Sequence, residues 1–389
     1  MESRHMTIKK FAFEVQSSLS KAHGIELKRS HVHEVLAALF GFASYTALTT
    51  QRVLAQHDDP GTAIPLDVAG AAARALDLGY TPPMPPIIAT VTAGAAVAER
   101  LCVVTIADVL ATLGIESSSD EPDAPADDAS GEYDSEADDE WEPRDEERLP
   151  WIDLDSDILR ESLLRLAGAQ SASAHLALAQ LDEEFLEDDF ASVNDGVYWF
   201  EQQQAGRLLT GVELEWAQTY RRKQEALLSR EDHLGRAAAL GNVEAALRQA
   251  EKEPSDEAFE LAGRLAGARH AARLGRLAMS CGREDDALKW FRVAAQQGDT
   301  NAMKTLASEL ETDLKDAWTW AYLAELLGTN VMAYHAVGDD GLPADADEAG
   351  PIYAVGGFEL DGLSKADDEA ATLRARELFS AIADRGVVR

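Results

Sequence analysis

The sequence predicts a mainly α-helical protein, with a helical N-terminal module, a short α-solenoid and a β-hairpin insertion near the C-terminus. Three observations support this fold class. Hydrophobic residues make up 46% of the chain; alanine and leucine are abundant, and runs of β-branched residues are rare. Apolar residues recur at helical spacing in most segments. In the C-terminal half, glycines recur at intervals of about thirty residues, where predicted helices end.

The length and one acidic segment suggest the domain organisation. A chain of 389 residues is too long for one core, so two or three units are expected. Residues 116–148 contain sixteen Asp/Glu and two Arg, with almost no apolar side chains beyond Tyr133 and Trp141. Such a segment is predicted to be a disordered, extended linker, because it cannot bury enough surface to offset its ordering entropy. The alternative is an acidic tail that binds a basic partner or mimics DNA. The flanking domains are predicted at residues 7–115 and 149–389.

The charge distribution limits the classes of partner. The formal net charge is −35, so most of the chain repels phosphate backbones and anionic lipid surfaces. This argues against membrane binding and disfavours nucleic-acid binding. Residues 1–57 are an exception, with seven Lys/Arg against four Asp/Glu. The alternative function is therefore a regulator that contacts nucleic acid through residues 7–57, in the manner of a helix-turn-helix. Its candidate cations are Lys9, Lys10, Lys21, Lys28, Arg29 and Arg52.

The cysteines and the apolar segments predict a cytoplasmic protein. Cys102 and Cys281 form neither a disulfide framework nor a CxxC metal motif, and both are expected to be small buried hydrophobes. No signal peptide is predicted before residue 30. The longest largely apolar stretch, 87–98, is too short to span a bilayer.

Residues 7–57 are predicted to form three short helices. Phe11, Val15 and Leu19 give the first helix an apolar face, and serines at positions 30 and 44 are candidate N-caps for the next two. The run 30–48 reads as a helix with the pattern hEvLA, then Gly-Phe, then a serine-aromatic pair. It resembles a helical segment of bacterial glyoxalase-related proteins. The resemblance implies a helical module without glyoxalase activity, because that activity needs a βαβββ metal site, which is not predicted here.

Between this module and the repeats, further helices are expected. Residues 58–115 are alanine-rich and predicted to be helical, interrupted by an extended connector at the prolines of 81–86 and ending in a helix at 104–113. After the linker, helices are predicted at 156–166, 172–190 and 211–229.

A repeat begins near residue 236. The runs 286–294 and 316–324 share Asp, Ala, Trp and Ala at an offset of thirty, and Gly298 and Gly328 follow at the same offset. Each unit is predicted to be a helix pair whose second helix ends at a glycine in the left-handed conformation. Alanines at 245, 271 and 302 would let paired helices approach closely, while Trp290 and Trp320 would fill the space between successive pairs.

One of these units resembles a known repeat family. The run 272–299 contains an Ala-x-Leu-Gly motif, a later glycine, Ala-x-x-Trp-Phe and Ala-Ala-x-x-Gly-Asp. It is similar to a Sel1-like repeat, a relative of the tetratricopeptide repeat. The resemblance implies two to three repeats over about residues 236–328. A β-hairpin insertion is predicted at 330–364 and a capping helix at 366–384, with Leu373, Leu378, Phe379 and Ile382 on its apolar face.

The sequence contains no phosphate-binding, dinucleotide-binding, nucleophile-elbow or HExxH motif. We therefore predict no catalytic, cofactor-binding or metal-ligating residues, and a protein that is not an enzyme. The predicted function is a scaffold or adaptor that binds another protein or peptide on the concave face of the solenoid. The candidate partner-binding residues are His270, Arg273, Arg276, Asn301 and Lys304. A basic stripe there would fit an acidic or C-terminal peptide, whereas the alternative is that these are solvated helix positions.

Overall fold

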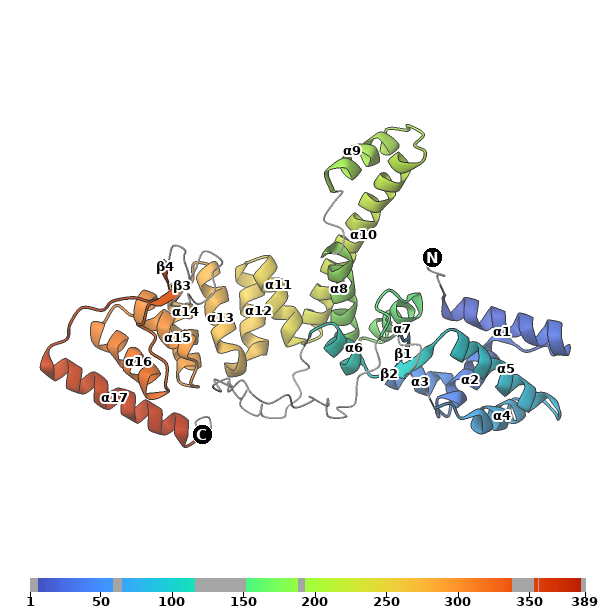
Figure 1. The fold of residues 1–389 in the computed structure, drawn as a ribbon, viewed down its shortest axis with the longest axis horizontal. Coiled ribbons are helices and arrows are strands. Elements are labelled where there is room, and N and C mark those ends of the chain that lie inside the picture. The colour runs from blue at the N-terminus through green and yellow to red at the C-terminus, as the bar shows by residue number, and fades with distance from the viewer. Residues whose placement is uncertain are drawn as a thin grey trace, which may run out of the picture. The chain divides into compact units, whose positions relative to one another are not determined.

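The fold is described from a computed structural model, and the described residues are 6–58, 65–115, 152–187, 193–337, 353–355 and 357–385. They divide into two compact units on either side of the bond between Asn242 and Val243. Helices predominate in both units, which confirms the predicted mainly α class (Figure 1). The acidic segment predicted at 116–148 lies outside the described residues.

The first unit begins with three helices, as predicted: α1 (Ile8–His23), α2 (Arg29–Leu39) and α3 (Tyr45–Gln51). The apolar face of α1 is buried against α2 and α5 (Met84–Ala98). Ser44 caps α3, because its side chain accepts a hydrogen bond from the amide of Ala47 at 3.1 Å. Ser30 does not cap α2, which begins one residue before it without a side-chain cap.

Two strands interrupt the region predicted to be helical. β1 (Val53–Gln56) pairs antiparallel with β2 (Leu101–Val104). Each strand has only four residues, and its partner lies far along the chain, so local periodicity gives no signal for the pair. Between them lie α4 (Val68–Asp77) and α5, and α6 (Ile106–Thr112) follows. The predicted extended connector at 81–86 is wrong, because two of its prolines occupy the first turn of α5, where a missing N–H costs no helical hydrogen bond.

The predicted domain boundary before residue 149 also differs from the observed one. α7 (Asp157–Gly168) packs against β1 and α3, and Ile158 is buried in the same hydrophobic cluster as Phe11 and Leu36. The Ser156 hydroxyl donates to Gln56 Oε1 at 2.7 Å. The chain after the acidic segment therefore returns to the N-terminal core, and the first unit continues to residue 242.

Three further helices complete the first unit: α8 (Ala172–Glu187), α9 (Val193–Gln204) and α10 (Val212–Ala239). α9 was not predicted, and α10 extends ten residues beyond its predicted end at 229. One part of α10 packs against α8 and the other against α9 (Figure 1). At the second contact, a Cβ on Gly196 would lie 2.9 Å from Tyr220 Cβ, so this glycine permits the close approach of α9 and α10.

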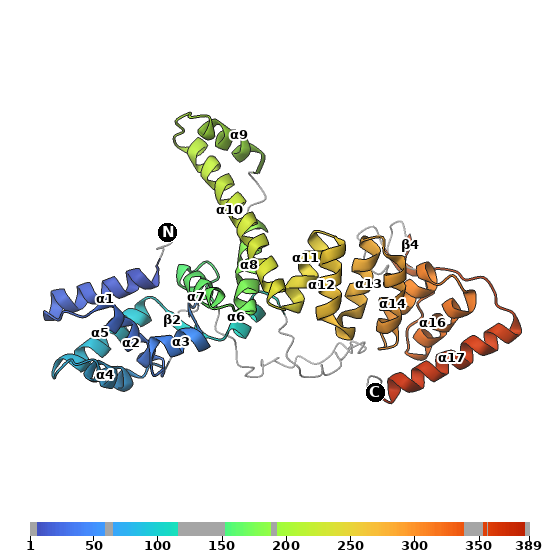
Figure 2. The ribbon, with the colours of Figure 1, turned by 180° about the vertical axis from the view of Figure 1, so that it is seen from behind.

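The second unit contains three helix pairs in sequence, which Figures 1 and 2 show side by side. The first pair is α11 (Val243–Lys252) and α12 (Asp256–Ala266). The second is α13 (Ala271–Ser280), preceded by the 3₁₀ turn η1 (Ala268–His270), and α14 (Glu284–Ala295). The third is α15 (Thr300–Thr305), continued by the π-helical turn η2 (Leu306–Leu310), and α16 (Leu314–Leu326).

The backbone of the pairs follows the predicted design. Ala245, Ala271 and Ala302 are buried in the first helices of the three pairs. Gly241, Gly298 and Gly328 have φ of 92°, 100° and 90°, in the left-handed region that ends a helix. The three alanines and these glycines agree with the prediction. Gly267, at the end of the first pair, does not, because its ψ of −161° lies outside the left-handed helical region although its φ is 59°.

The C-terminal elements are β3 (His335–Val337), β4 (Tyr353–Val355) and α17 (Lys365–Ala383). β3 and β4 pair antiparallel, which confirms the predicted hairpin, although residues 338–352 between them lie outside the described residues. α17 packs on α16 and buries Ala371, Ala375 and Ile382. The predicted apolar face is wrong at Leu373, which is 61% exposed, because the contacting helix lies on the alanine side.

The apolar centre of the second pair is Phe291 rather than Trp290. Phe291 is buried, whereas Trp290 is half-buried, and its ring edge lies 4.0 Å from where a Cβ on Gly263 of α12 would be. Trp290 therefore contacts the preceding pair, as predicted, at the edge of the core. A Cβ on Gly275 would lie 2.8 to 2.9 Å from the Phe291 ring. The Phe291 ring of α14 therefore packs directly on the α13 backbone at Gly275.

We predict that Gly275→Ala destabilises the second unit by about 1–3 kcal/mol, because the added methyl overlaps the Phe291 ring in a packed core. The measurement is urea unfolding followed by circular dichroism. Gly263→Ala is the matched control, since its methyl has room and mid-helix alanine is favoured over glycine by about 0.5–1 kcal/mol. Equal effects of the two variants would contradict the packing role of Gly275.

Candidate functional site

The five predicted partner-binding residues lie on the first helices of two successive pairs, as expected. His270 is in η1, Arg273 and Arg276 are on α13, and Asn301 and Lys304 are on α15. Arg276 and Asn301 are exposed, while the other three are half-buried. Exposure alone therefore singles out Arg276 and Asn301 as the most accessible members of the set.

Arg273 is already engaged within the second unit. Its Nε and Nη2 donate to the Glu251 carboxylate at 2.6 and 2.7 Å, and its Nη1 donates to Glu244 at 2.5 Å. The hydrogen bonds that the guanidinium donates to these carboxylates raise its pKa, and those to Glu251 have the larger effect. Arg273 thus joins α13 to α11 and connects two successive helix pairs, so its guanidinium is already occupied within the unit.

Charge separates between the first and second helices of the pairs. The first helices, α11, η1–α13 and α15–η2, carry six Lys/Arg and three Asp/Glu. The second helices, α12, α14 and α16, carry four Lys/Arg and eight Asp/Glu. The positive excess comes from η1 and α13, through Arg269, Arg273 and Arg276. In a chain of net charge −35, this is a local surface to which anionic groups are attracted.

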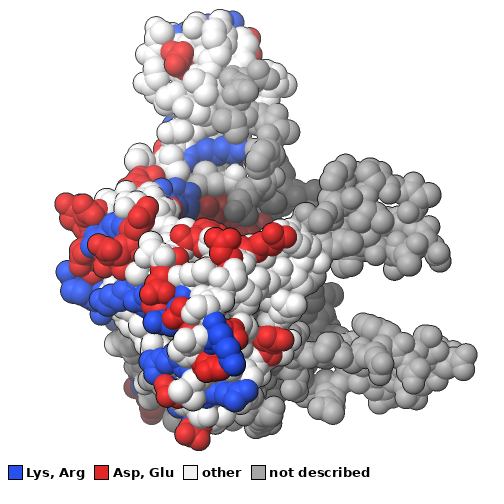
Figure 3. Space-filling view, turned by 90° about the vertical axis from the view of Figure 1, so that its left-hand side faces the viewer, with Lys and Arg blue, Asp and Glu red and all other residues white. Residues whose placement is uncertain are grey.

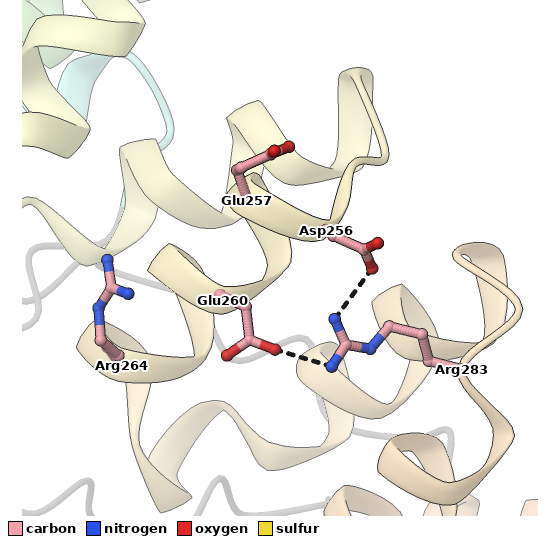
Figure 4. A pocket seen from close by; sticks show the side chains of 5 residues that line it. All are labelled: Asp256, Glu257, Glu260, Arg264 and Arg283. Carbon is pink, nitrogen blue, oxygen red and sulfur yellow. Dashed lines mark hydrogen bonds and ion pairs between the residues drawn. The ribbon is translucent and has the colours of Figure 1, made fainter.

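The second helices border a shallow hollow of about 560 Å³ (Figure 4). Asp256, Glu257, Glu260 and Arg264 of α12 line it together with Arg283. Arg283 donates to Asp256 at 3.1 Å and to Glu260 at 2.7 Å, and Figure 4 shows Arg264 on the other side of Glu260.

Arg283, one of the two arginines that line this hollow, already pairs with the neighbouring carboxylates. Arg283 also donates to Asp286 at 2.7 Å and lies 4.3 Å from the centre of the Phe259 ring. The hydrogen bonds that Arg283 donates to Glu260 and Asp286 raise the pKa of its guanidinium. The lining contains no Ser, Cys, His or Lys side chain that could act as a nucleophile or a proton carrier. Arg283 links α12 to the turn before α14, which is a structural role.

A third arginine completes this series of contacts. Arg292 of α14 donates through Nε and Nη2 to Glu311 at 2.7 and 2.6 Å, and Trp320 Nε1 donates to the same carboxylate at 3.0 Å. The Glu311 side chain is only 3% exposed.

Figure 3, which views the molecule from the left-hand side of Figure 1, shows Lys/Arg and Asp/Glu interspersed on that face, without a large field of one sign.

In the first unit, the residues of the serine-aromatic motif hold helices together. The His33 ring stacks on the Tyr45 ring at 4.7 Å, and Arg165 of α7 donates to the Tyr45 hydroxyl at 2.6 Å. Glu34 pairs with Arg74 of α4 at 2.5 Å. His31 instead lies against Tyr80, at 2.9 Å between Nδ1 and the hydroxyl. His31 and His33 therefore face different neighbours.

Cys102 behaves as predicted and Cys281 only in part. Burial raises the pKa of the Cys102 thiol to about 12, so it stays protonated and unreactive on β2. Cys281 is half-buried at the end of α13. Among the described residues, no group of three or more His, Cys, Asp or Glu side chains is arranged to hold a metal ion.

A histidine pair between α8 and α10 was missed by sequence reasoning. His175, 3% exposed, and His233 lie with their Nδ1 atoms 2.8 Å apart. One Nδ1 must donate and the other accept, so the pair cannot carry protons on both. Burial lowers the pKa of both rings; His175 further lowers that of His233, and Arg236 lowers both, while Asp232 opposes the shifts. The two residues are 58 positions apart, so spacing gave no signal.

We predict that the first unit loses stability as pH falls below about 6.5, the ordinary histidine pKa in the unfolded chain. Both folded-state pKa values are lowered, so in this window the unfolded state binds more protons and acid favours unfolding. The measurement is urea unfolding at pH 7.5 and pH 5.5. His175→Gln/His233→Gln should reduce the dependence, because the two rings that take up protons on unfolding are then absent. An equally steep loss in the double variant would contradict this origin.

Comparisons with known proteins leave the family of the chain open. No family model matches the sequence, and no curated protein and no solved structure shows significant similarity to it. Within the described residues, no helix is both long and apolar enough to cross a membrane.

Proposed function

We propose that this chain is a non-enzymatic adaptor of the bacterial cytoplasm that binds an acidic segment of another protein on the first-helix face of a short Sel1-like solenoid. We define this face by the exposed or half-exposed residues of η1, α13 and α15: Arg269, His270, Arg276, Asn301 and Lys304. The observation that carries the proposal is the separation of charge, since the first helices are net positive and the second helices net negative.

The architecture supports this surface for binding. Stacked helix pairs present their first helices on one continuous side, which repeat proteins use for extended ligands. The ion pairs of Arg273 with Glu244 and Glu251 hold α11 and α13 together, and they do not involve Arg276 or Lys304. These two cations stand on successive pairs, so a peptide that crosses from α13 to α15 would meet both. Complementary charge would give such a complex specificity and a fast association rate.

The test combines selection and charge reversal. The full chain is used to select phage-displayed peptides, which should be enriched in Asp and Glu. The best peptide, labelled with fluorescein, is then titrated by anisotropy against wild type and Arg276→Glu/Lys304→Glu. We expect about a tenfold loss of affinity in the variant, about 1.4 kcal/mol. Its melting temperature should not change, because neither side chain is buried.

The control is Lys365→Glu on α17, a side chain that is 91% exposed and lies outside the first-helix face. It changes the net charge in the same direction but should retain peptide affinity. Selected peptides without acidic residues, or equal losses in both variants, would refute the proposed surface.

A further inference from the structure

The outer face of α1 carries an exposed aromatic ring among lysines. Phe13 is 59% exposed, although the neighbouring apolar residues of α1 are buried. Lys9 and Lys10 lie one turn before it and Lys21 two turns after it, and all three are exposed. The core does not require Phe13, because α1 contacts α2 and α5 through its other face.

Serine side chains and further cations extend this face. Ser17 and Ser20 lie between Phe13 and Lys21 at helical spacing, and Lys28 and Arg29 are exposed at the start of α2. From Met6 to Arg29 the chain has five Lys/Arg against two acids, Glu14 and Glu26. The distance from Lys10 to Lys21 is about 17 Å at 1.5 Å per residue, about five stacked nucleotides at 3.4 Å each.

We infer that the outer face of α1 binds single-stranded nucleic acid, with a base stacked on Phe13 and phosphates paired with the lysines on either side. Single-strand sites need only cations that follow the backbone and an exposed ring on which bases stack. Both are present on one helix. Complementary charge thus identifies a polyanion, and the exposed ring identifies one that has flat aromatic groups.

Two other anionic partners fit the face less well. An acidic peptide would pair its carboxylates with the lysines, but it has no flat aromatic group to stack on the exposed Phe13 ring. Duplex DNA would need a basic helix for the major groove. The expected helix-turn-helix does not supply one, because α3 has seven residues and contains neither Lys nor Arg.

The net charge of the chain does not oppose this local binding. The Debye length is about 8 Å at physiological salt, so carboxylates farther away than this are largely screened. The nearest acids in sequence, Glu14 and Glu26, are outnumbered by the five cations of the same segment. Binding should nevertheless depend strongly on salt, since it is based on few phosphate contacts.

The experiment measures fluorescence anisotropy of the full chain with labelled (dT)12 and (rU)12, between 20 and 200 mM salt. Phe13→Ala should weaken binding about tenfold. Lys9→Gln/Lys10→Gln/Lys21→Gln should reduce the slope of log K against log salt by about 2, at 0.7 per phosphate contact. The matched controls are Leu373→Ala, an exposed apolar residue of α17, and Lys289→Gln/Lys315→Gln/Lys365→Gln in the second unit; both should bind as wild type.

The outcomes separate the partner classes. A twelve-base-pair duplex and polyglutamate should each bind more weakly than (dT)12. Three results would overturn the inference: no binding of either single strand at 20 mM salt, unchanged affinity in Phe13→Ala, or polyglutamate bound as tightly as (dT)12. Because Phe13 is exposed, Phe13→Ala should melt as wild type, and a lower melting temperature would also count against a binding role.

Discussion

The second unit depends on arginine-carboxylate contacts that link one helix pair to the next. Arg273 joins α13 to α11, Arg283 joins the α13–α14 turn to α12, and Arg292 joins α14 to Glu311 ahead of α16. Within each pair, buried alanines let the two helix backbones approach closely. The ion pairs connect successive pairs, alongside apolar contacts such as that of Trp290 with α12. Exposed pairs of this kind stabilise by about 0–1 kcal/mol. Glu311 differs from the other carboxylates because its side chain is largely buried and also accepts a hydrogen bond from Trp320.

This arrangement explains why an arginine count is a poor guide to a binding surface. From the sequence, Arg273 and Arg276 are equivalent cations on one predicted helix. In the structure, Arg273 satisfies three donors on Glu244 and Glu251, while Arg276 projects from the same helix and is exposed. A residue that already neutralises two carboxylates adds little attraction for a third. Among the candidate residues, Arg273 is thus engaged within the unit, whereas Arg276 is exposed and Lys304 half-buried.

Features that depend on local sequence were mostly predictable, whereas features that depend on distant contacts were not. Gly298 and Gly328, the buried alanines and the cap at Ser44 each depend on a few neighbouring residues and appeared where expected, while Gly267 and Ser30 did not. The β1–β2 pair, the histidine pair and the return of α7 to the N-terminal core each join segments dozens of residues apart. The composition of the acidic run 116–148 predicted a domain boundary, but the segments before and after it belong to one unit.

Because the segments on both sides of the acidic run belong to one unit, the net charge cannot be divided between two domains at that run. If an acidic segment separated two domains, each could be assigned its own net charge and its own partner. Instead, the outer face of α1 and the first-helix face around α13 each carry a local excess of cations over acids, within units that are otherwise rich in carboxylates. Screening over about 8 Å makes such faces act independently of the total charge of −35. Partner chemistry therefore follows from which cations are still exposed after the internal ion pairs have formed.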